Sequence, residues 1–114
     1  MNNRMGNGRM PAANIADLAI TDFTPHLGTV FEVSWRGRTV PVTLALAEAL
    51  PPSGLPPGTC RAAPFQLQFE EPEWTLPQHI HPISHPGIGA LSIFMVPIGP
   101  NREQTGFRYQ SVFT

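Results

Sequence analysis

The sequence predicts a small antiparallel all-β domain, and three features of the chain lead to that prediction. Several short segments alternate apolar and polar residues with a period of two, which is the pattern of half-buried strands. The 14 prolines and 10 glycines interrupt the chain too often for long helices. A chain of 114 residues, 41% of them hydrophobic, is long enough to bury one core. We therefore expect a sandwich or open barrel of about six strands, with a short helical turn near the N-terminus.

The chain divides into a tail and one domain. Residues 1–13 are rich in Asn, Gly and Arg and have no period, so we expect a tail that is flexible or is ordered by a partner. Residues 14–114 form a single β domain. This domain begins with a helical turn that Gly28 ends, in which Phe23 and Leu27 close one end of the core.

The period of two first appears at Phe31, Val33 and Trp35, and a turn at 36–38 leads into a second strand. Pro41 lies within that second strand. Because proline cannot donate a ladder hydrogen bond, we expect the strand to lie at a sheet edge near Pro41. The remaining strands are expected at residues 65–69, 76–83, 91–98 and 107–113.

The segment 91–98 differs from the others because it is apolar on both faces. This pattern predicts a strand in the centre of the fold. The expected core residues are Phe31, Val33, Phe65, Leu67, Leu91, Ile93 and Phe94.

Composition argues against several classes of function. Only 13% of the residues are charged, about half the usual share, and the net charge is -1. The seven basic residues are scattered arginines, which argues against nucleic-acid binding. The absence of lysine excludes Schiff-base chemistry and a Walker-type phosphate loop. The lone Cys60 cannot form an intramolecular disulfide.

The sequence also bears on location. No apolar run approaches the ~20 residues of a membrane span, and residues 1–10 lack the apolar centre of a secretory signal. We expect no membrane partner and synthesis in the cytoplasm, with an exported or surface assembly as a further destination.

The histidines of segment 78–85 are the sharpest candidate site. On an extended strand His79 and His81 project to the same face, and His85 joins them if the strand bends. Three imidazoles are suitable ligands for zinc or another divalent transition metal, and cupin-type barrels use a His-x-His pair of this kind. The alternative is a polar strand face, with His85 hydrogen-bonded at a turn.

Two neighbouring patterns have plainer interpretations. Ser84 and His85 point to opposite faces of a strand, so they are not a nucleophile and its base. Gly87 and Gly89 lack the rest of a dinucleotide fingerprint and predict a turn with positive φ before the next strand.

The acidic and tryptophan residues complete the candidate sites. Glu70, Glu71 and Glu73 are potential calcium ligands, but without a supporting Asp/Asn pattern they predict a solvated acidic turn. The period of two places Trp35 in the core. The predicted partner-binding residues are Trp74, Arg4 and Arg9.

The order of these segments resembles a family of small, uncharacterised bacterial proteins known as a domain of unknown function. The resemblance covers residues 17–114 and is most specific in the C-terminal part, where a His-Pro-x-x-Gly turn, a Phe-Leu-Val-Pro-Ile-Gly-like strand and a Tyr-x-x-Val-Phe end follow one another. The matching residues are Phe23, Gly28, Phe31, Phe65, Leu67, Phe69, Leu76, Gln78, His85, Pro86, Gly89, residues 94–99, Tyr109, Val112 and Phe113. The chain departs from the pattern at His79-Ile80-His81, where relatives tend to have Gly-Thr-Tyr.

The resemblance implies no established activity. Family members are often encoded near proteins that resemble phage-tail collar fibres, which implies a fibre-like or tail-collar-like partner. Our first hypothesis is a noncatalytic β module that self-associates or binds such a partner. The second is a small cupin-like barrel that binds a metal or ligand through His79 and His81. No nucleophile and base pair up in the sequence, so we do not expect an enzyme.

Overall fold

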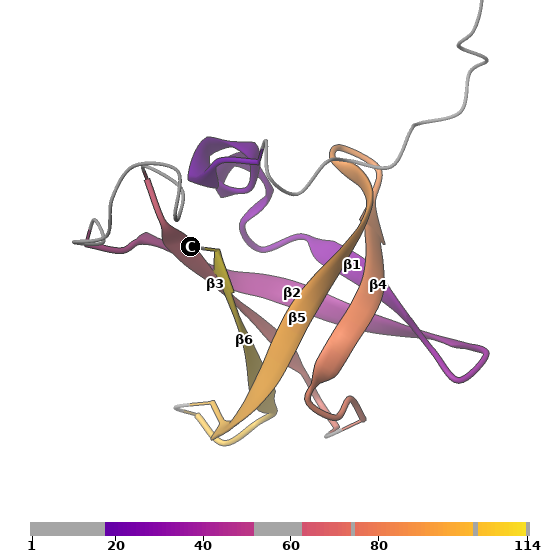
Figure 1. Ribbon diagram of the computed structural model, residues 1–114. Coiled ribbons are helices and arrows are strands. Elements are labelled where there is room, and N and C mark those ends of the chain that lie inside the picture. Colours follow the sequence, from indigo (N-terminus) through magenta and orange to yellow (C-terminus); the bar gives the residue numbers. More distant parts are fainter. Residues whose placement is uncertain (1–17, 52–62, 74, 102, 114) are drawn as a thin grey trace, which may run out of the picture.

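Among the residues that the structure describes, the chain forms six strands and two single turns of 3-10 helix, which confirms the predicted all-β class (Figure 1). The computed structural model describes residues 18–51, 63–73, 75–101 and 103–113. The turns are η2 (Ile20–Asp22) and η3 (Thr24–His26). The strands are β1 (Val30–Trp35), β2 (Arg38–Ala49), β3 (Phe65–Glu71), β4 (His79–His85), β5 (Gly89–Pro100) and β6 (Phe107–Phe113).

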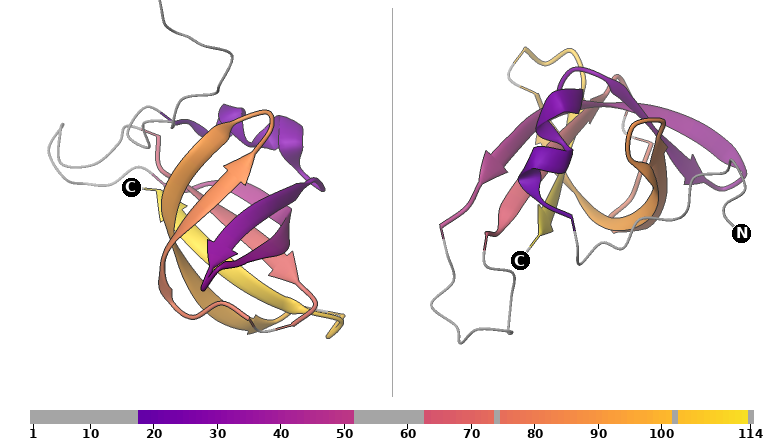
Figure 2. Two further views of the ribbon diagram at one scale, coloured as in Figure 1. Left: turned by 90° about the vertical axis from the view of Figure 1, so that its right-hand side faces the viewer. Right: turned by 90° about the horizontal axis from the view of Figure 1, so that it is seen from above.

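The strands close into a barrel in the order β1-β2-β3-β6-β5-β4, and every pairing is antiparallel. The sequence predicted a sandwich or an open barrel, and closure removes the free edges of those forms. A local edge remains near Pro41. This residue pairs with Glu32 of β1, while the pairing of β2 with β3 begins only at Thr43. The tip of the β1–β2 hairpin, formed by the end of β1 and the start of β2, therefore extends beside the barrel (Figures 1 and 2).

β2 and β5 are the two longest strands of the barrel. The pairing register of each strand shifts at one point along its length. In β2 the shift lies between Leu44 and Leu46. An extra residue at this point reverses the alternation of faces, so Ala47 packs against the core and Leu46 is only half-buried. In β5 the shift lies between Pro97 and Gly99, and Gly99 supplies a φ of 106°.

One apolar core fills the barrel. Phe65 and Phe113 stack with ring centroids 4.5 Å apart, and Phe23 lies 5.8 Å from each of them. The predicted core residues that the structure buries are Phe31, Val33, Phe65, Leu67, Leu91 and Ile93. The prediction for Phe94 was wrong, because its side chain points outward and is 49% exposed. Trp35, also predicted for the core, is partly buried against it.

The two helical turns lie over one end of the barrel, the upper end in Figure 1. Phe23, between them, is buried as predicted, but Leu27 is 45% exposed. The reason is that the backbone of Leu27 is already extended, with φ -57° and ψ 135°, so the i, i+4 alignment of a continuous helix is lost. Within the described ranges, no helix has the length and apolar character needed to cross a membrane.

Candidate functional site

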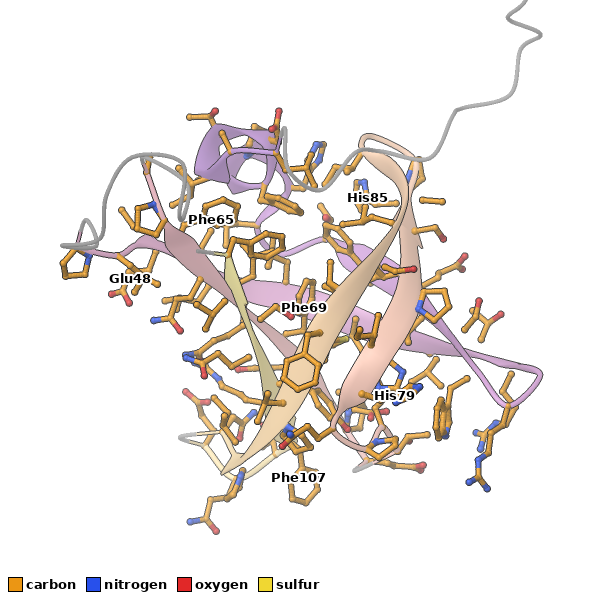
Figure 3. The ribbon with its side chains drawn as sticks, in the orientation of Figure 1. Glu48, Phe65, Phe69, His79, His85 and Phe107 are labelled. Carbon is orange, nitrogen blue, oxygen red and sulfur yellow. The ribbon has the colours of Figure 1, made fainter. Side chains whose placement is uncertain are left out.

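The three histidines of β4 do not come together. His79 and His81 share the face that points into the barrel, as predicted, and their ring centroids lie 5.6 Å apart. His85 is six residues from His79, a distance of about 20 Å along a strand, and the two lie near opposite ends of β4 (Figure 3). Across the part of the chain that the structure describes, no three His, Cys, Asp or Glu side chains are grouped to hold a metal ion. Metal binding by His79 and His81 stays a prediction.

His81 is not part of the polar strand face that was the alternative prediction, because it is fully buried. Its Nε2 donates to the carbonyl oxygen of Pro77 at 2.8 Å, and its Nδ1 has no hydrogen-bond partner among the described residues. The ring of Trp35 packs edge-on against His81 at 5.1 Å and against His79 at 5.7 Å. The guanidinium of Arg36 lies 5.3 Å above the Trp35 ring. His81 is therefore held through Nε2, while its buried Nδ1 has no partner among the described residues.

His85 lies at the other end of the barrel, hydrogen-bonded at the turn as the alternative prediction stated. Its Nδ1 accepts the Gly87 N–H at 2.9 Å. Its Nε2 lies 3.0 Å from Thr29 Oγ1, and Thr29 gives its only hydroxyl proton to the His26 carbonyl. Nε2 is therefore the donor and His85 is neutral in this arrangement. Burial, and then the nearby His26, lower the pKa of His85.

His26 links the helical turns to the β4–β5 turn. Its ring centroid lies 4.5 Å from that of His85, and its ring rests directly on Gly87. A Cβ at position 87 would lie 2.5 Å from His26 Cε1, so any larger residue there would displace the His26 ring. Gly89 has a φ of 109°, which confirms the predicted positive-φ turn before β5.

The acidic segment 70–73 is the predicted solvated turn only at Pro72 and Glu73, which form an exposed bend, whereas Glu70 and Glu71 belong to β3. Glu70 forms a 2.7 Å ion pair with Arg108, and Glu71 is buried. Tyr109 donates its hydroxyl proton to Glu71 at 2.5 Å and accepts the Leu76 N–H at 3.1 Å. Burial and the bond to Glu71 raise the pKa of Tyr109. Glu71 is buried because β3 extends to residue 71, which faces inward like Phe69 two residues earlier, and there the Tyr109 hydroxyl reaches its carboxylate.

A row of exposed apolar side chains crosses β4, β5 and β6. We call Ile80, Phe94 and Val112 the outer apolar face. Ile80 is 58% exposed, Phe94 49% and Val112 50%, and Ile80 is the direct cross-strand partner of Phe94. The three residues border one hollow of about 250 Å³ between β5 and β6. The sequence signal was present in the two apolar sides of 91–98, but we assigned both sides to the core.

The hollow exists because β5 and β6 separate. Their pairing runs from Val96↔Gln110 toward the lower end, and above that point the two ribbons diverge (Figure 1). We call the space between Ser92–Met95 of β5 and residues 111–113 of β6 the β5–β6 opening. Ser111 lines it and is 1% exposed, and its Oγ has no hydrogen-bond partner in the described chain. A buried hydroxyl without a partner is uncommon and requires an explanation.

The remaining predicted contacts cannot be placed. Trp74, Arg4 and Arg9 lie outside the described residues, so their assignment as partner-binding residues stays a prediction.

The barrel and its sites define a small all-β domain. A family model described as a domain of unknown function (DUF6916) matches residues 18–113. The chain therefore belongs to the DUF6916 family, in agreement with the resemblance drawn from its motifs. No curated protein and no solved structure matches the chain.

Proposed function

We propose that this protein is a noncatalytic assembly module that associates through its outer apolar face. The observation that carries the proposal is the exposure of Ile80, Phe94 and Val112 side by side on three adjacent strands. Single exposed apolar side chains are normal, whereas a contiguous group around a hollow is typical of a protein–protein interface. An aromatic residue at the centre of such a group is a frequent energetic anchor.

The neighbouring wall of the barrel supports the assignment by contrast. Over β3 and the first part of β6, residues 108–110, the outward side chains are polar and bonded to one another. Gln110 donates to Gln66 at 2.6 Å, Gln66 donates to Glu48 at 2.6 Å, and Arg108 donates to Gln68 and Glu70. This wall has its hydrogen bonds satisfied and needs no partner. The outer apolar face has no comparable network, and its burial against another molecule would be favourable.

The first partner we propose is a second copy of the chain. The net charge of -1 creates little repulsion between copies. A fibre-like or tail-collar-like protein is the second, and it rests on the family resemblance alone.

The test is the mass of the full chain in solution as a function of concentration, by sedimentation or light scattering. We expect self-association that Phe94→Ser weakens, since serine removes the central ring. Val30→Ser is the matched control, because Val30 is 51% exposed on β1, away from the outer apolar face. A concentration-independent monomer, or equal effects of the two substitutions, would refute self-association through this face.

One observation favours metal binding as a second function. Histidines that bind metals usually donate their other ring N–H to a backbone carbonyl or carboxylate, and His81 holds its Nε2–H on Pro77 while its Nδ1 stays unbonded. His79, beside it, would supply the second imidazole for a divalent transition metal.

Metal content and zinc or copper titration of the full chain would test this function. We expect stoichiometric binding that His79→Gln abolishes and that His26→Gln, at the other end of the barrel, leaves unchanged. His79 is the residue to change because it is exposed, so its loss does not disturb the core. Binding that persists in His79→Gln, or no binding to the unmodified chain, would reject the site.

A further inference from the structure

We propose that the β5–β6 opening receives residues 10–16 of a second copy of the chain as an added strand. This inference rests on the proposed self-association and names the segment that each copy contributes. The steps that lead to it concern the opening, the chemistry of the segment and the choice between one chain and two.

The opening is built for an extended peptide. Ser92–Met95 of β5 pair with β4 on one side, and Ser111 and Val112 pair with β3 on theirs. Among the described residues, these two stretches have no ladder to each other. Two strand edges that face a common gap offer main-chain donors and acceptors, which is the requirement for β-strand addition. Ser111 Oγ, buried and without a described partner, adds one side-chain hydrogen bond for an incoming backbone group.

The lining of the opening selects an uncharged segment. Ile80, Ser92, Ile93, Phe94, Ser111, Val112 and Phe113 line the hollow. None of these residues carries a charge, so a charged side chain that entered would lose its hydration without finding a counter-charge. The opening therefore accepts small or apolar side chains, and the most polar side chain that fits it is an uncharged amide.

Residues 10–16 have that chemistry. They read Met-Pro-Ala-Ala-Asn-Ile-Ala, an uncharged stretch bounded by Arg9 and Asp17. Seven extended residues span about 23 Å, more than the three or four residues that border the opening on each side need. The segment also starts from the correct end of the barrel. Leu18 packs against the core just after it, and Phe23, which follows, lies 5.8 Å from Phe113.

Exchange between two copies accounts for both unusual features of this wall. A segment folded back within one chain would lie in the plane of the barrel wall and cover only the flanks of Ile80 and Phe94, whose outward ends would still face water. When a second copy supplies the segment, its barrel comes against the outer apolar face, and the reciprocal segment fills the second opening. One symmetric interface then buries the exposed row and satisfies the Ser111 hydroxyl in both copies.

Disulfide trapping between full-length chains tests the exchange. All variants carry Cys60→Ser, which removes the only native thiol. One chain carries Val112→Cys, and the other carries Ala12→Cys, Ala13→Cys or Asn14→Cys in turn, because three consecutive positions sample both faces of a strand. The two chains are mixed and oxidised, and the heterodimer is quantified without reductant. In the matched control Ser34→Cys, exposed on β1, replaces Val112→Cys.

We expect at least one of the three pairs to form heterodimer well above the Ser34→Cys control. A chain with both cysteines that closes only on itself would overturn the proposal in favour of an intramolecular strand. No cross-link above the control would overturn it outright. If the Phe94→Ser variant nevertheless reduces the mass of the assembly, the outer apolar face remains the interface and only the exchange fails. A monomeric parent chain removes both proposals.

Ser111→Ala supplies a second measurement that keeps the fold. Loss of one hydrogen bond to the added strand should weaken association about fivefold. The stability of the separate barrel should not fall, since in it the hydroxyl has no described partner. Unchanged association in Ser111→Ala would contradict the role of this hydroxyl, and reduced stability of the monomer would assign it to the barrel alone.

Discussion

The neutral ring of His85 makes two hydrogen bonds, one from the Gly87 N–H in the β4–β5 turn and one to Thr29, and it packs against His26 at the end of the helical turns. Protonation of Nδ1 would remove the acceptor of the Gly87 N–H and place a charge beside His26. The folded-state pKa is therefore lowered below 6.5, first by burial and then by His26. Because the unfolded chain binds the proton more readily, the stability from this site is complete above pH 6.5. It is lost as the pH falls from 6.5 through the folded-state pKa.

We accordingly predict that the free energy of unfolding decreases on acidification below pH 6.5, and that His85→Gln makes the decrease smaller. Glutamine keeps one acceptor and one donor in this place but does not titrate. Denaturant unfolding at a series of pH values measures the slope. His79→Gln, which changes an exposed histidine at the other end of β4, is the control. Equal slopes for the parent and His85→Gln would contradict the assignment.

Tyr109 and Glu71 show at the same scale why a charged residue can be misassigned from sequence. Glu71 stands in a run of acidic residues next to a proline, a composition that normally means exposure. Its burial depends on Tyr109, 38 residues later in the chain. The pairing of β3 with β6 brings the Tyr109 hydroxyl to the Glu71 carboxylate. Thr75 also donates its backbone N–H to Glu71. A buried carboxyl with two donors is stable, but its partners are set by the barrel and not by neighbours in the chain.

At the scale of the elements, β5 separates a core face from an exposed face although both are apolar. Met95 is fully buried and Phe94, the preceding residue, is half exposed. We predict that Phe69→Ala, which empties a fully buried site in β3, costs about 3–5 kcal/mol. Phe94→Ala should cost about 1 kcal/mol or less, since its ring is already half in water.

Urea unfolding below the concentration at which the chain associates gives both values. This condition matters because an assembled Phe94 would be buried and would report the interface as well as the barrel. A cost for Phe94→Ala near that of Phe69→Ala would mean that the outer side of β5 is covered within the monomer.

The strands also show which features of the fold could be predicted from the sequence. Alternation located β1 and β3, since Phe31, Val33, Phe65 and Leu67 face the core as the period of two requires. Closure of the barrel could not be derived, because it depends on the pairing of β1 with β4 through two residue pairs only. The inward turn of Ala47 after the register shift in β2 was equally hidden, because one extra residue inverts the period. The grouping of three histidines was wrong in part for a similar reason. The period of two correctly placed His79 and His81 on the same side of β4, but it carries no information on their distance from His85.

At the scale of the whole molecule, we propose separable roles for the described barrel and the N-terminal segment. The core lies within residues 23–113, and the family match begins at residue 18. Removal of residues 1–16 deletes none of the described core side chains, and we predict that the barrel keeps its fold and its unfolding transition. Self-association should weaken, because the deletion removes the segment that we assign to the β5–β6 opening of the partner copy.

Sedimentation of the parent and the shortened chain at equal concentrations measures the loss, and circular dichroism checks that the strands persist. A chain shortened by residues 1–8 is the matched control, since it retains Met10 to Ala16 and should associate like the parent. If both truncations weaken association equally, the contact lies before residue 9, where Arg4 is the predicted partner residue. If neither does, the outer apolar face alone joins the copies, and Phe94→Ser should then have the larger effect on the mass of the assembly.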